Sequence, residues 1–330
     1  MKSELEKGSL GLSTGLEYEA AFFSSKSEVI ELAKAASEAG GRYISHIRSE
    51  DIYIEEAIEE IIAIGREAKL PVQLSHAKIA MRSKWGNSTA LLAGLQRARA
   101  GGVDITLDVY PYTMWSSTPR VLFPKKDFTN KTSAEFATRE LFDPATSYLT
   151  RYTAEPAYEG KTIQQVADMN NESTADALMR VIRLTEEKSG SDAIAATSMS
   201  EEDVIQFIKW PYSTICSDGT FGGHPRGHGS FPRVLARYVL EKKILSLEEA
   251  IYKMTGLTAS NLGITNRGLI ANGFYADLVL FNPETIQDKA TITNPTALST
   301  GVEKVWVNGQ LVYDQQKATL SRPGKLIKKQ

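Results

Sequence analysis

The sequence predicts an α/β fold with a buried parallel sheet, followed by a smaller β-rich segment. Over the first 110 residues, short apolar strands alternate with amphipathic helices, which is typical of a parallel sheet covered by helices. Four predicted strand ends lie 33, 30 and 32 residues apart: Ser13, His46, His76 and Asp108. That spacing is about the length of one strand–helix unit, roughly 30 residues. After residue 263 the pattern becomes rich in strands, so we divide the chain into residues 1–263 and 264–330.

Each element of the repeat has a local signal. The strands are predicted at residues 10–14, 42–46, 72–76 and 104–108. Between them, apolar residues recur at helical spacing, as in Ile54, Ile58, Ile61 and Ile62. Ser25 with Glu28 predicts a capping box at the start of the first helix, and Gly40-Gly41 predicts its end.

A polar stretch punctuated by prolines, from about residue 113 to residue 171, interrupts the repeat. We interpret this stretch as an insertion over one end of the sheet, in the manner of a substrate lid. The repeat then resumes with the following predicted elements: a helix at 175–188, a strand at 193–197, a helix from Glu201, a strand at 213–217, and helices at 232–241 and 247–255. Ser246 with Glu249 predicts a capping box for the last helix.

The final segment is predicted to contain strands at residues 277–281 and 302–314. The second of these contains Asn308-Gly309, a strong signal for a two-residue hairpin turn. We therefore predict a small β domain that packs beside the larger α/β part.

The composition excludes several classes of protein. The 38 basic and 40 acidic residues give a net charge of −2, so neither nucleic acid nor an anionic membrane is expected as a partner. No apolar run reaches the length of about 18 residues that a membrane span needs, and the first ten residues lack the apolar stretch of a secretory signal. The single cysteine, Cys216, cannot form an internal disulfide. We expect a soluble, cytoplasmic protein, with any export signal lying upstream of Met1.

Two of the four histidines stand at equivalent places in the repeat, since His46 and His76 each end a predicted strand. The carboxyl ends of parallel strands form one face, where active sites of α/β proteins lie. Two imidazoles that converge there are suitable ligands for a zinc-like metal. The alternative for each histidine alone is a structural hydrogen bond at the strand end.

Other candidates follow the same strand ends. Asp218 ends a predicted strand, where a carboxylate can act as general base, bind metal or cap a turn. Arg226 follows in a glycine-rich segment and can hold a carboxylate with two hydrogen bonds. Lys78 and Tyr110 come two residues after His76 and Asp108, at the same rim. A cation and a phenol there suit an anionic substrate that develops an oxyanion.

The motifs together resemble the D-aminoacylase (N-acyl-D-amino-acid deacylase) branch of the amidohydrolase superfamily. The resemblance covers essentially the whole chain and rests on an ordered series of motifs: Gly11 to Tyr18, His46 to Glu50, Ser75 to Lys78, Trp85-Gly86, Asp108 to Tyr112, Ser217 to Gly219, His224 to Arg226, Ala276 to Val279, Val307 to Gly309 and Arg322 to Gly324.

This resemblance implies a partial (β/α)8 TIM-type barrel in residues 1–263, about strands 4–8, and a C-terminal segment of a β-sandwich in residues 264–330. It implies zinc-dependent hydrolysis of the amide of small N-acyl-D-amino acids to a D-amino acid and a carboxylate. Matched by motif, the residues take these roles: His46 and His76 bind Zn²⁺, Asp218 and Tyr110 are catalytic, and Tyr18, Lys78 and Arg226 bind the substrate.

Two departures from the family pattern are visible. Ala77 stands where many relatives carry a second histidine, although the matching ligand His76 is present. No His-X-His motif or ligand cysteine precedes His46, so the zinc ligand set in this chain is incomplete. We therefore expect the C-terminal two-thirds of a deacylase, which needs an upstream segment or a second chain.

Two alternatives remain open. One is a cyclic amide or imide hydrolase of the dihydroorotase or hydantoinase type, although such enzymes usually carry a carboxylated lysine on the fourth strand, and residues 10–14 contain no lysine. The other is a catalytically dead remnant or partner subunit, which the incomplete ligand set favours.

Overall fold

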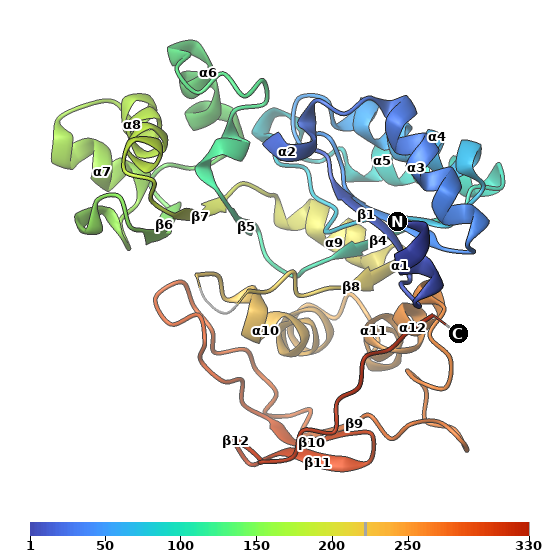
Figure 1. Ribbon diagram of the computed structural model, residues 1–330. Helices are drawn as coiled ribbons and strands as arrows, with labels where there is room; N and C mark the ends of the chain where they lie inside the picture. The colour runs from blue at the N-terminus through green and yellow to red at the C-terminus, as the bar shows by residue number, and fades with distance from the viewer. Residues whose placement is uncertain (221–222, 330) are drawn as a thin grey trace.

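The main sheet has five strands that are all parallel to their neighbours (Figure 1). The computed structural model describes residues 1–220 and 223–329. The strands follow the spatial order β1-β2-β3-β4-β8, with these bounds: β1 (Gly11–Gly15), β2 (Arg42–His46), β3 (Val72–Leu74), β4 (Ile105–Val109) and β8 (Ser213–Ile215). Five of the six strands predicted for the parallel repeat are confirmed, each ending within two residues of the expected end, so their carboxyl ends meet at one edge of the sheet.

Helices connect the first four strands and cover the sheet: α3 (Lys26–Glu38), α4 (Ile54–Ala68) and α5 (Ser88–Ala100), which lie together in Figure 1. The predicted apolar face of α4 is buried, with Ile61 and Ile62 each 2% exposed. The side chain of Ser25 accepts a hydrogen bond from the amide of Glu28 at 3.2 Å, which is one half of the predicted capping box. The helices thus bury the apolar strands and leave the strand ends to form the site.

A second, antiparallel sheet of three strands is formed by β5 (Met114–Ser117), β7 (Asp192–Thr197) and β6 (Tyr148–Tyr152), in that order. The prediction that residues 193–197 continue the parallel repeat was wrong, because β7 pairs with β5 and β6. An apolar strand pattern reports burial but not the pairing partner. Three helices pack around this sheet: α6 (Lys131–Phe136), α7 (Ile163–Asn170) and α8 (Thr174–Glu187).

The chain then passes through helices and ends in a third sheet. The helical elements are α9 (Glu201–Lys209), α10 (Arg226–Arg233), its π-helical continuation Val234–Glu241, α11 (Leu247–Met254) and α12 (Gly256–Leu262). Ser246 and Glu249 form the complete capping box predicted for α11. Shorter helical segments are α1 (Lys2–Glu6), α2 (Glu19–Phe22), Arg82–Lys84, Pro119–Leu122, Ala137–Leu141 and Pro156–Tyr158.

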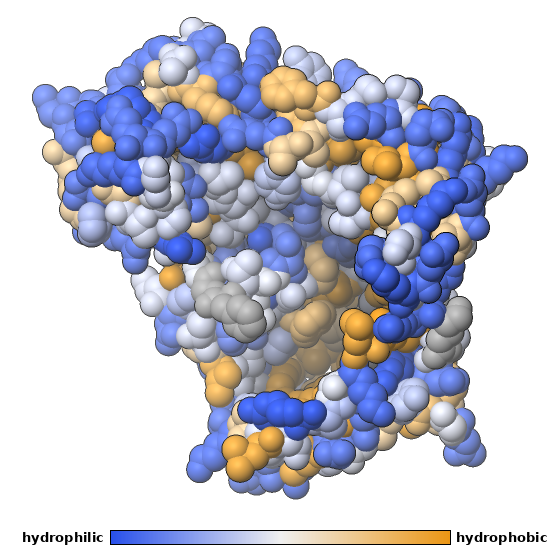
Figure 2. All heavy atoms as spheres, viewed as in Figure 1, coloured by the Kyte–Doolittle hydropathy of each residue, from blue (hydrophilic) through white to orange (hydrophobic). Residues whose placement is uncertain are grey.

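The third sheet is antiparallel, in the order β12-β11-β10-β9, with these bounds: β9 (Leu278–Phe281), β10 (Val302–Val307), β11 (Gln310–Asp314) and β12 (Lys317–Ala318). The predicted hairpin turn is confirmed, because Asn308 and Gly309 have φ values of 48° and 80° between β10 and β11. Both residues of a type I′ turn need positive φ. Figure 2 shows that this face of the molecule is hollowed between the third sheet and the α/β part above it.

Within the part of the chain that the structure describes, the search for helices long and apolar enough to cross a membrane finds none.

Candidate functional site

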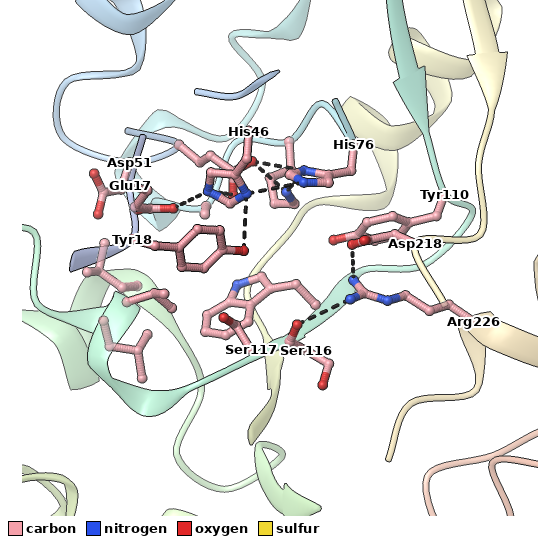
Figure 3. A pocket seen from close by; sticks show the side chains of 17 residues that line it. Glu17, Tyr18, His46, Asp51, His76, Tyr110, Ser116, Ser117, Asp218 and Arg226 are labelled. Carbon is pink, nitrogen blue, oxygen red and sulfur yellow. Dashed lines mark hydrogen bonds and ion pairs between the residues drawn. The ribbon is translucent and has the colours of Figure 1, made fainter. Parts of the chain in front are cut away.

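The carboxyl ends of the parallel strands open into one pocket (Figure 3). It is lined by all seven residues that the sequence singled out: Tyr18, His46, His76, Lys78, Tyr110, Asp218 and Arg226. Residues from the second sheet and the segments after it complete the wall: Trp115, Ser116, Ser117, Val121, Leu122 and Leu141. The structure therefore brings together strand ends that are up to 200 residues apart along the chain, as a parallel sheet requires.

The two histidines point one ring nitrogen at each other. His46 ends β2, and His76 follows β3 in a left-handed conformation with φ of 39°. Nδ1 of His46 lies 3.1 Å from Nε2 of His76, and the Tyr18 hydroxyl lies 3.3 Å from the same Nδ1. We call these two facing atoms the inner nitrogens.

The other ring nitrogens, the outer nitrogens, face acidic side chains. Nε2 of His46 lies 2.6 Å from Oε2 of Glu17. Nδ1 of His76 lies 3.2 Å from Oε1 of Glu50 and 2.6 Å from Nζ of Lys78. Lys78 also donates to Glu50 at 2.6 Å. The histidine pair is thus embedded in a buried network of charged groups.

Burial and neighbouring charges shape this network. Burial alone would raise the pKa of Glu50, but its basic neighbours, His46 and Lys78 first among them, hold it below its usual value. Burial, together with the Lys78 ammonium, lowers the pKa of His76. At neutral pH His76 is therefore uncharged, which is the form of imidazole that binds metals. Burial raises the pKa of Tyr18 to about 12, so its hydroxyl keeps its proton.

Arg226, Asp218 and Tyr110 form a second group on the opposite wall. Nη1 of Arg226 lies 2.8 Å from Oδ2 of Asp218, and Nη2 donates to the carbonyl of Ser116 at 3.2 Å. The guanidinium carbon lies 4.8 Å from the centre of the Tyr110 ring. The Tyr110 hydroxyl is buried and has no hydrogen-bond partner among the described residues. Burial raises the pKa of Tyr110, so this hydroxyl is a free donor that faces the pocket.

His224, in the glycine-rich segment before α10, has a structural role. Its Nε2 lies 3.1 Å from the carbonyl of Met114, and its Nδ1 accepts from the backbone amide of Arg226 at 3.0 Å. Burial, reinforced by the charge of Arg226, lowers its pKa to about 3. The ring stays neutral and fixes the start of α10, from which Arg226 reaches the pocket.

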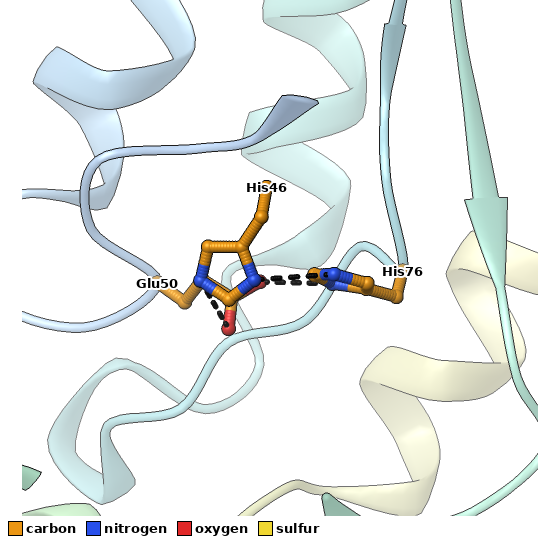
Figure 4. A group of neighbouring side chains, drawn as sticks. All are labelled: His46, Glu50 and His76. Atoms are coloured by element: carbon orange, nitrogen blue, oxygen red, sulfur yellow. Dashed lines mark hydrogen bonds and ion pairs between the residues drawn. The ribbon is translucent and has the colours of Figure 1, made fainter. Parts of the chain in front are cut away.

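The sequence reasoning missed three buried acidic residues of the pocket: Glu17, Glu50 and Asp51. Among residues 1–220 and 223–329, the side chains of His46, Glu50 and His76 form a group that could hold a metal ion, with donor atoms within 4.8 Å of one another (Figure 4). Glu50 lies four residues after His46, and Glu17 directly precedes Tyr18. Acidic residues just past a predicted strand end were the available signal.

Comparison with known proteins identifies relatives over the whole chain. The model of the amidohydrolase family matches residues 212–313. N-acyl-D-glutamate deacylase of Alcaligenes xylosoxydans xylosoxydans is 37% identical over 98% of this chain and 62% of its own length. D-aminoacylase of the same organism is 34% identical over 98% of this chain and 62% of its own. The chain thus spans about three-fifths of the length of the curated relatives it matches.

Solved structures give the same picture. A crystal structure of D-aminoacylase matches with a TM-score of 0.84 and 32% identity, over 97% of this chain and 63% of that one. N-acyl-D-glutamate deacylase from Bordetella bronchiseptica, complexed with zinc and a phosphonate inhibitor, matches with a TM-score of 0.86 and 34% identity, over 99% and 64%. D-hydantoinase matches with a TM-score of 0.51 at 10% identity, over 96% and 66%, a likeness of fold alone. The resemblance inferred from the motifs is confirmed.

Proposed function

We propose that this chain is a member of the amidohydrolase family and acts in the zinc-dependent hydrolysis of N-acyl-D-amino acids. The observation that carries the proposal is the single pocket in which the two inner nitrogens meet beside Asp218, Tyr110 and two cationic side chains. We also propose that the five parallel strands are part of a (β/α)8 barrel, which the similarity to D-aminoacylase structures supports.

The residues present fit a zinc ion. Two ligands on a tetrahedral zinc with bonds of about 2.0–2.1 Å stand about 3.3 Å apart. The inner nitrogens of His46 and His76 are 3.1 Å apart and need almost no movement to reach that separation. His46 and His76 would therefore hold the ion through Nδ1 and Nε2. When bound, zinc supplies Lewis-acid polarisation of a carbonyl and lowers the pKa of water.

The remaining groups divide the work of amide hydrolysis. The Asp218 carboxylate accepts a proton from the attacking water and returns it to the leaving nitrogen. The buried Tyr110 hydroxyl, which has no partner among the described side chains, donates to the oxygen that becomes negative. The Arg226 guanidinium and the Lys78 ammonium attract the substrate carboxylate, with the Tyr18 hydroxyl beside them.

A hydrolysis assay tests the proposal. The chain is incubated with Zn²⁺, alone and together with the upstream segment of N-acyl-D-glutamate deacylase, and with N-acetyl-D-amino acids, N-acetyl-L-amino acids or hydantoins, and the released amine is quantified. We expect release from the D-substrates alone, and loss of that release in His76→Asn. His228→Asn is the matched control, because His228 is also a histidine but does not line the pocket.

Hydantoin hydrolysis without deacylation would favour the cyclic-amide alternative over our proposal. No hydrolysis of any substrate by a zinc-loaded, folded chain would favour the inactive subunit.

A further inference from the structure

The contact between Glu17 and His46 is the shortest that either ring of the histidine pair makes with a carboxylate. Oε2 of Glu17 lies 2.6 Å from Nε2 of His46, and the next carboxylate oxygen, Oε2 of Glu50, lies 3.8 Å from that nitrogen. Both partners are buried, with Glu17 7% and His46 9% exposed. Water therefore competes little for this hydrogen bond.

This contact determines which nitrogen of a neutral His46 carries the proton. A neutral imidazole has one N–H donor and one nitrogen with a free lone pair, and an ionised carboxylate only accepts. Glu17 therefore holds the proton on Nε2. The lone pair is then left on Nδ1, the inner nitrogen, which faces His76 and the Tyr18 hydroxyl.

The same argument does not fix the proton of His76. Its outer nitrogen lies 3.2 Å from a Glu50 oxygen, which accepts, and 2.6 Å from the Lys78 ammonium, which donates. The two neighbours favour opposite tautomers of His76. Of the two carboxylates, Glu17 is therefore the one that fixes the tautomer of the histidine it contacts.

Glu17 also has charged neighbours of both signs besides His46. Its negative charge, after burial itself, is a cause of the raised pKa of Asp51, so the two buried acids repel each other. Among the residues that the structure describes, Glu17 has no bidentate arginine partner of the kind that Arg48 provides for Glu60. A buried acid with a like-charged neighbour is costly unless favourable contacts offset the cost. The hydrogen bond to His46 does so, together with the charge of the half-buried Lys126, which attracts both acids.

We propose that Glu17 is a positioning residue, which fixes the tautomer and ring orientation of His46 so that Nδ1 presents its lone pair to the pocket. This role rests on the proposed function. In many metalloenzymes, a metal-binding histidine donates its second ring N–H to such a carboxylate. It names a role for a residue outside the set that contacts metal or substrate.

The first test needs no metal and no activity. Long-range ¹H–¹⁵N correlation spectra of the metal-free chain at pH 8, with ¹⁵N-labelled histidine, report which ring nitrogen carries the proton. We expect the His46 proton on Nε2 in the wild type and a mixture of tautomers in Glu17→Met. Asp51→Asn is the matched control, because it removes the neighbouring buried carboxylate and should leave the His46 tautomer unchanged. A His46 proton that stays on Nε2 in Glu17→Met overturns the proposal.

The second test measures Zn²⁺ affinity by competition with a chelator. We expect Glu17→Met to bind Zn²⁺ about 10 to 100 times more weakly than the wild type, and Asp51→Asn to bind it equally well. Equal affinity in Glu17→Met and the wild type contradicts the proposal. If Glu17→Met does not fold, both measurements are made on Glu17→Ala, which also lacks an acceptor, and an unchanged tautomer with unchanged affinity there would refute the proposal. The tautomer measurement needs no activity. A chain that does not hydrolyse N-acyl-D-amino acids can therefore still show whether Glu17 fixes the His46 tautomer, and the two negative results are distinguishable.

Discussion

Ionisation of the buried Asp51 carboxylate should lower the free energy of unfolding as pH rises, and Asp51→Asn should remove this contribution. Asp51 is 4% exposed, and burial together with the charge of Glu17 raises its pKa from 3.8 to about 7. In the unfolded chain the group titrates near its ordinary value. Between pH 3.8 and about 7 the unfolded chain loses this proton while the folded protein keeps it. Because the unfolded state binds fewer protons in that window, the free energy of unfolding falls as pH rises.

The size of the effect follows from the shift. A difference of about 3 pKa units corresponds to about 4 kcal/mol, which is an upper bound for the stability lost by pH 8. Asparagine keeps the oxygen that accepts from the Ser49 hydroxyl and the Ile52 amide, at 2.5 and 2.6 Å in the wild type. Asp51→Asn therefore removes the charge and retains these bonds.

Urea denaturation between pH 4 and pH 8 measures the difference in the free energy of unfolding between variant and wild type. We expect the two proteins to be about equally stable at pH 4, and the variant to gain an advantage that grows up to pH 8. Glu60→Gln is the control, since Arg48 binds the Glu60 carboxylate through two contacts of 2.8 Å, and this variant should lose stability at pH 8. An Asp51→Asn advantage that is absent or independent of pH would refute the reasoning.

Three further predictions concern other sites. Asp203→Ala should lower the free energy of unfolding, measured by urea denaturation, by about 1–3 kcal/mol, because the Asp203 carboxylate accepts from the amides of Gly86 and Ser88 at the start of α5. The control Glu202→Ala, at an exposed position, should change this free energy little. Burial lowers the pKa of His224 to about 3, so the melting temperature of the wild type should fall as pH drops from about 6.5 toward 3. In thermal denaturation, His224→Asn should show a smaller fall over the same pH range. Asp218→Asn should lower kcat for N-acetyl-D-amino acids at least about 100-fold with Zn²⁺ affinity retained; an unchanged kcat would remove Asp218 from the mechanism.

The parallel sheet was predictable from the sequence because its repeat is local. Each strand–helix unit occupies about 30 residues, and each strand end carries its own residue of interest, so His46, His76 and Asp218 could be placed at one face without knowing any distance. The partner of β7 was not predictable, since antiparallel pairing with β5 and β6 joins segments about 40 to 80 residues apart through contacts that leave no periodic signal.

The sequence signal for the acidic half of the site, acidic residues just past a predicted strand end, does not show which of these residues enter the pocket. The chain has 40 acidic residues, and most of them are ordinary surface groups. Only the fold distinguishes Glu17, which contacts the outer nitrogen of His46, from Glu19, which lies two residues away on α2. The same holds for His224, which belongs to one of the family motifs and which only its buried hydrogen bonds identify as structural.

The second sheet supports the pocket through its backbone. His224 contacts the carbonyl of Met114, and Arg226 donates to the carbonyl of Ser116, so two β5 carbonyls fix the guanidinium. Side chains of the same strand, including those of Trp115 and Ser117, line the pocket wall. Because the supporting acceptors are main-chain atoms, these wall residues can be exchanged while the Arg226 anchor is retained. Under the proposed function, strand β5 separates the backbone that holds the Arg226 anchor from the side chains that can diverge to select the rest of the substrate.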